Sequence, residues 1–198
     1  MNKAIFFTSI LSAILLTSCG DNSKEAITEK DNVVKPVSEV KKPVAKRSDN
    51  AVIVEQLLKR EPSDNAGMLA DSKLLVDGLK DDEIRDISNS LWAGTNGFER
   101  NRRASGALAV TAFEKSPENW SMLRSGISYV NGMGVNQNAS KAINILSDLS
   151  LVDSSAAQFF LAKAYDLDGK SDLAINQFRK AANMGHRLAK QELIQRGQ

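Results

Sequence analysis

A helical pattern that repeats along the C-terminal half of the chain is the strongest constraint on its fold. The matched positions are Gly126 with Ala162 and Tyr129 with Tyr165, at an offset of 36 residues, and Ala142 with Ala174 and Leu146 with Phe178, at an offset of 32. A period of this length accommodates two antiparallel helices and their turns, and it is typical of a solenoid. A longer turn around Gly132-Met133-Gly134-Val135 accounts for the difference between the two offsets.

The side chains within each unit have sizes that suit a helix pair. Gly126 and Ala162 are small, so we expect the paired helix to approach closely there. The larger residues, which we expect to fill the space between helices, are Tyr129, Leu146, Tyr165 and Phe178. Apolar spacing from residue 50 onward is helical throughout, with no convincing period-2 segment. Ser116 before Pro117 predicts a helix start with Ser116 as N-cap, and Gly185 predicts a helix end.

Two stretches resemble a known repeat family. Leu123-Arg124-Ser125-Gly126-Ile127-Ser128-Tyr129, the turn Asn131 to Val135, and Lys141-Ala142 resemble a Sel1-like repeat. Lys180-Ala181-Ala182-Asn183-Met184-Gly185-His186 resembles the family's junction between units, although the second unit lacks the Gly-x-Gly-Val turn and is also similar to a tetratricopeptide repeat. A weaker likeness covers 81–118. The resemblance implies stacked helix pairs that bind other proteins.

These observations together predict an all-α fold, a right-handed α-α solenoid of about three Sel1-like or tetratricopeptide-like helix pairs with extra N-terminal helices. The predicted segments are a signal peptide at 1–18, a lipidated cysteine with a flexible tether at 19–50, N-terminal helices at 51–80, a degenerate repeat at 81–118, Sel1-like repeats at 119–153 and 154–185, and a capping helix at 186–198.

The first twenty residues resemble the export signal of a bacterial lipoprotein. A basic start precedes an apolar run, Ala4 to Leu16, that is too short to span a bilayer. Leu16-Thr17-Ser18-Cys19 resembles the lipobox, in which acyl chains are attached to the cysteine thiol. The resemblance implies acylation of Cys19, and Gly20 after it favours the outer membrane over the inner membrane. A plain signal peptide with an incidental cysteine is the alternative.

The segment after Cys19 has the composition of a tether. Residues 21–49 contain no aromatic residue and no glycine, and Pro36 and Pro43 interrupt any helix. Such a segment buries too little apolar surface to offset its ordering entropy. We therefore expect a spacer between a lipid anchor in the cell envelope and a folded domain that faces the periplasm.

The first helix of each repeat offers a candidate protein-binding surface. Counting from the small residue of each unit, the predicted partner-binding positions are Trp120, Leu123, Ile127, Val130, Phe159, Lys163 and Asp166. An apolar floor with a few charges suits an amphipathic or extended peptide. Packing of the same stripe against the preceding repeat is the competing interpretation.

Composition argues against several other functions. One histidine and one cysteine exclude a multi-histidine metal centre and a cysteine-rich zinc site, so we expect no metal, cofactor or enzymatic activity. A net charge of +2 argues against a nucleic-acid partner. We expect His186 to pack at a helix end, and the cluster Arg100, Arg102 and Arg103 either to face water or to face acidic groups or lipid phosphates.

The expected partners are therefore another protein and, through Cys19, a lipid bilayer. One use is that of an adaptor in an envelope assembly. The other is that of an immunity protein that neutralises a type VI secretion effector such as a lipase, because some small Sel1-like lipoproteins have this role. A hydrolase is a more remote alternative. Both binding roles rest on analogy at the level of the fold.

Overall fold

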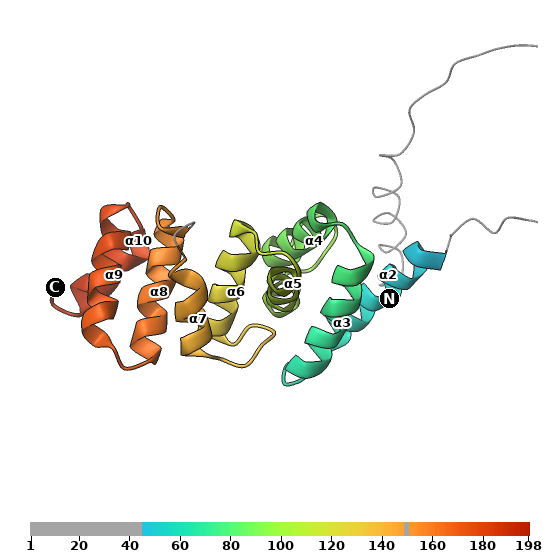
Figure 1. The fold of residues 1–198 in the computed structure, drawn as a ribbon, viewed down its shortest axis with the longest axis horizontal. Helices are drawn as coiled ribbons and strands as arrows, with labels where there is room; N and C mark the ends of the chain where they lie inside the picture. The colour runs from blue at the N-terminus through green and yellow to red at the C-terminus, as the bar shows by residue number, and fades with distance from the viewer. Residues whose placement is uncertain (1–44, 149–150) are drawn as a thin grey trace, which may run out of the picture. The chain divides into compact units, whose positions relative to one another are not determined.

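The computed structural model describes residues 45–148 and 151–198, with side chains from Asn50 onward except that of Ala51. Within these residues every regular element is helical, which confirms the all-α prediction (Figure 1). The helices are α2 (Ala45–Lys59), α3 (Asn65–Gly78), α4 (Asp81–Ala93), α5 (Arg102–Lys115), α6 (Asn119–Asn131), α7 (Ala139–Leu146), α8 (Ser155–Leu167), α9 (Ser171–Asn183) and α10 (Arg187–Gln195). The predicted signal peptide, Cys19 and most of the tether lie outside the described residues.

Successive helices pack on one another from α4 to the C-terminus, in the order of the chain (Figure 1). In addition, α6 contacts α8, and α3 contacts α5. Arg60, directly after α2, joins α2 to α3, because its Nε and Nη2 donate to the two carboxylate oxygens of buried Asp71 at 2.7 and 3.0 Å.

Three apolar clusters follow one another along this row of helices. The first is built from α2 to α5 around Leu57, the second from α5 to α8 around Leu146, and the third from α8 to α10 around Phe178; these three side chains are 0% exposed. Tyr165 packs against both the second and the third cluster. The expectation that Tyr129, Leu146, Tyr165 and Phe178 fill the space between helices is thus confirmed.

The turns after α4 and α6 are built alike. Each opens with a glycine in the left-handed conformation, Gly94 at φ 77° and Gly132 at φ 68°. Each closes with an asparagine N-cap, Asn101 or Asn138, whose side-chain oxygen accepts the backbone N–H three residues ahead at 3.0 and 2.8 Å. The main-chain N–H of each asparagine returns to a carbonyl of the preceding helix, at 2.8 and 2.9 Å. The α4–α5 and α6–α7 hairpins therefore share one turn geometry.

Small residues allow the closest approaches between helices. A Cβ added at Gly126 would overlap the Leu146 side chain of α7, which confirms the predicted close contact. Gly106 of α5 lies in the same way against the main-chain carbonyl of Met133 in the α6–α7 turn. On the other side of α6, Ser121, Ser125 and Ser128 are 0% exposed. The α5–α7 region consequently has little room for larger side chains.

Two local predictions are wrong and one is confirmed. Ser116 is the C-cap of α5 and not an N-cap, because the apolar pattern of α5 continues to Lys115. The next helix, α6, begins only at Asn119, and there the Ser121 hydroxyl accepts the Glu118 N–H at 3.1 Å. The helix α2 begins at Ala45, inside the predicted tether, since no proline or glycine follows Pro43 there. Gly185, at φ 86°, follows Met184, the C-cap residue of α9, as expected of a residue that closes a helix.

Candidate functional site

Three residues of the predicted partner-binding stripe lie in the interior. Ile127, Val130 and Phe159 are 8%, 4% and 6% exposed. Val130 belongs to the second apolar cluster, and Phe159 stacks on the His186 ring with centroids 4.4 Å apart. The expectation that these residues form the floor of an open groove is therefore wrong, because neighbouring helices cover them.

The other four predicted residues are half-buried and also engaged within the molecule. Trp120 packs against the first apolar cluster and Leu123 against the second. Lys163 pairs with Glu192 at 3.4 Å, and Asp166 pairs with Arg196 at 2.6 Å, so α10 and its C-cap residue hold the polar positions of α8. The seven residues do not come together in one open groove.

The face of α4 and α6 instead carries a tryptophan with two arginines. The guanidinium carbon of Arg124, from α6, lies 4.7 Å from the centroid of the Trp92 ring of α4. The guanidinium carbon of Arg102, at the start of α5, lies 5.1 Å from the same centroid. We call these three residues the Arg–Trp face. Both contacts have the geometry of a cation–π interaction.

Arg124 is held in place by groups of two other helices. Its Nη1 donates to the Ser105 hydroxyl at 2.8 Å and to the Ser88 carbonyl at 3.2 Å, and its Nη2 donates to Asn89 Oδ1 at 2.9 Å. Burial lowers the pKa of Arg124 to about 10, which leaves the guanidinium charged at neutral pH but poorly hydrated. The side chain is thus a fixed, partly desolvated positive charge.

The predicted basic cluster contributes only one of its members to this face. Arg100 donates to the Ala93 carbonyl at 3.3 and 3.4 Å, and Arg103 donates to Asn65 Oδ1 of α3 at 2.7 Å. Arg102 alone contacts Trp92. Sequence reasoning missed Arg124 and Trp92 as a pair, although Arg124 lies inside the predicted stripe, between Leu123 and Ile127.

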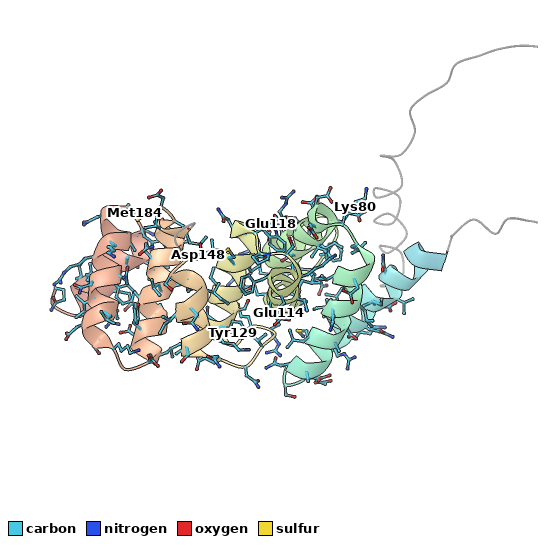
Figure 2. The ribbon with its side chains drawn as sticks, viewed as in Figure 1. Lys80, Glu114, Glu118, Tyr129, Asp148 and Met184 are labelled. Carbon is cyan, nitrogen blue, oxygen red and sulfur yellow. The ribbon has the colours of Figure 1, made fainter. Side chains whose placement is uncertain are left out.

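An open hollow of about 500 Å³ lies on the other side of α6, which lines it with Met122 and Tyr129. Met122 and Arg124 are two residues apart and hence about 200° apart around the helix. The hollow has an apolar floor, and its polar lining residues are Glu114, Lys141, Asn144 and Asp148; Figure 2 labels Glu114, Tyr129 and Asp148. Lys141 Nζ lies 3.4 Å from the Tyr129 hydroxyl and 5.1 Å from its ring centroid.

His186 is the N-cap of α10, so it lies at a helix terminus as expected. Its Nδ1 accepts the Ala189 N–H at 3.3 Å, and burial holds its pKa below the usual value. No three His, Cys, Asp or Glu side chains of the described residues are grouped so that they could hold a metal ion. None of the described helices is long and apolar enough to cross a membrane.

Comparison of the chain with protein-family models, with curated proteins and with solved structures gives no match. The residues themselves therefore carry the functional argument. They offer a fixed cationic face beside an aromatic ring on one side of α6, and an open apolar hollow on the other.

Proposed function

We propose that this chain is a protein-binding module of the bacterial envelope, an adaptor built as a right-handed α-α solenoid of about three Sel1-like or tetratricopeptide-like helix pairs. The shared geometry of the α4–α5 and α6–α7 turns carries this proposal. A left-handed glycine and an asparagine N-cap recur at Gly94 and Asn101, and again at Gly132 and Asn138. A recurring helical hairpin cannot bury its apolar face alone, so hairpins stack and leave extended side surfaces for partners.

Acylation of Cys19 would fix this module to a membrane on the periplasmic side, with residues 20–44 as the spacer. Acyl chains contribute about 0.8 kcal/mol for each methylene buried in the bilayer, so several chains anchor a protein durably. We expect Cys19→Ser to abolish incorporation of radiolabelled palmitate and to release the chain from the membrane fraction. Labelling that survives this substitution would contradict the anchor.

Site-specific photo-crosslinking in intact cells tests the binding role. Asn131 is exposed and lies two helical turns beyond Arg124 on the same face of α6. Asn176 is also exposed, on α9, and provides a matched control. A photoreactive amino acid at 131 should give a discrete adduct of higher mass, and the same amino acid at 176 should not.

Mass spectrometry of the adduct then identifies the bound protein. An envelope assembly component supports the adaptor role, whereas a secreted toxin would contradict it and indicate immunity. No adduct from position 131, or equal adducts from both positions, would contradict a binding surface on this face.

A further inference from the structure

The two arginines of the Arg–Trp face have no carboxylate partner among the described residues. None of the ion pairs formed by the side chains of that part of the chain includes Arg102 or Arg124. The partners of Arg124 are a carbonyl, a hydroxyl and an amide oxygen, and the contact of Arg102 is the Trp92 ring. Two unneutralised charges so close together favour an anion between or beside them.

The spacing of these charges suits more than one carboxylate. Both guanidinium carbons lie close to one ring centroid, at 5.1 and 4.7 Å, and hence lie no more than about 10 Å from each other. Alternate side chains of an extended peptide point to the same side and lie about 7 Å apart. Two acidic side chains of one strand can therefore each reach an arginine.

We propose that the Arg–Trp face binds an acidic segment of the partner protein in an extended conformation. One carboxylate pairs with Arg124 and another with Arg102, and the apolar stems of the peptide pack on the Trp92 ring. This inference rests on the proposed binding function and names its partner class. A lone phosphate would place its charge at one point, whereas two acidic side chains of one strand can pair with both arginines at once.

Arg124 should contribute most to the binding affinity, because its side chain is ordered before a ligand binds. Its contacts with Ser88, Ser105 and Asn89 fix the guanidinium before a ligand arrives, so binding costs little further side-chain entropy. Its charge is also partly removed from water, which makes pairing with a carboxylate stronger than at a fully exposed lysine or arginine.

Fluorescence anisotropy with a fluorescein-labelled hexaglutamate peptide tests the proposal on the full-length chain in detergent. We expect saturable binding that weakens as salt is added. Arg124→Gln should weaken it about tenfold, and the exposed Arg102→Gln about threefold. The matched control is Arg187→Gln, which removes the same charge from α10 and should leave the affinity unchanged. Equal loss in Arg187→Gln would mean non-specific attraction and overturn the proposal.

A conservative variant guards against misfolding. Arg124→Lys keeps the charge but loses the planar fork, so we expect weakened binding with an unchanged helical circular dichroism spectrum. Full affinity in this variant would overturn the assigned role of Arg124. Competition with glutarate and with glycerol 3-phosphate separates the two ligand chemistries: stronger displacement by the phosphate would indicate a lipid-binding face and refute the acidic segment.

The binding titration and the photo-crosslinking experiment distinguish failure of the acidic-segment proposal from failure of the proposed binding function. If hexaglutamate does not bind while the photo-crosslinker at Asn131 still captures a partner, the binding module stands and the acidic class fails. If neither result appears, both fail.

Discussion

Two glycines have the same left-handed backbone conformation but different surroundings. Alanine substitutions at these two positions therefore separate the cost of backbone strain from the cost of crowding. Gly134, in the α6–α7 turn, and Gly169, in the α8–α9 turn, both have φ 73°. An alanine at either position pays for the left-handed conformation, about 1–2 kcal/mol. Only Gly134 is also crowded, because an added Cβ would overlap the Arg103 carbonyl and lie 2.9 Å from the Ala107 nitrogen. No atom of the described residues lies within 4 Å of a Cβ at Gly169.

The difference between the two substitutions should therefore be the cost of crowding alone. The atoms that would oppose the new methyl group at Gly134 are backbone atoms of α5, which cannot rotate away. Overpacking of this kind costs about 1–3 kcal/mol. We expect Gly169→Ala to lower the free energy of unfolding by about 1–2 kcal/mol and Gly134→Ala to lower it by about 2–5 kcal/mol.

Thermal unfolding followed by circular dichroism at 222 nm measures this difference. For a folded unit of this size, about 2–4 °C corresponds to 1 kcal/mol, so Gly134→Ala should melt roughly 2–12 °C below Gly169→Ala. Gly185→Ala, at φ 86° with open space around it, is a second control that should behave like Gly169→Ala. Equal losses at Gly134 and Gly169 would refute the tight contact between this turn and α5.

Three further experiments test the packing of the helices. Burial lowers the pKa of His186 below its ordinary 6.5, so the unfolded chain binds the proton more strongly; the melting temperature should fall as pH drops below about 6.5, and His186→Asn should remove that part of the pH dependence. Phe178→Ala, at a side chain that is 0% exposed, should cost about 3–5 kcal/mol in urea unfolding. Gly126→Ala and Leu146→Ala should each destabilise the chain, but the double variant should lose about 0.5–3 kcal/mol less than their sum, because the smaller side chain makes room for the new methyl group.

The sequence predicted those parts of the fold that depend on local chemistry. The helical spacing, the small residue at Gly126 and the helix end at Gly185 all follow from patterns within one or two turns of the chain. The helix boundary at Ser116 failed for a related reason: serine before proline is common both at the end of one helix and at the start of the next. Only the continued apolar pattern of α5 decides between the two, since it carries that helix to Lys115.

The candidate site was harder to predict because it depends on distances that no local pattern contains. Counting by helical periodicity placed Ile127 and Phe159 on an open face, but both side chains are buried in the folded chain, and Phe159 stacks on His186 at the start of α10. The pairing of Arg124 with Trp92 joins residues 32 positions apart, on helices that are separated in the chain by α5. One signal in the sequence could have indicated Arg124. It is a charged residue between the apolar positions Leu123 and Ile127, on a helix that was expected to be largely covered. A half-buried arginine in such a place needs a local explanation. The serine, asparagine and tryptophan contacts explain its position, and they leave its charge without a carboxylate partner among the described residues.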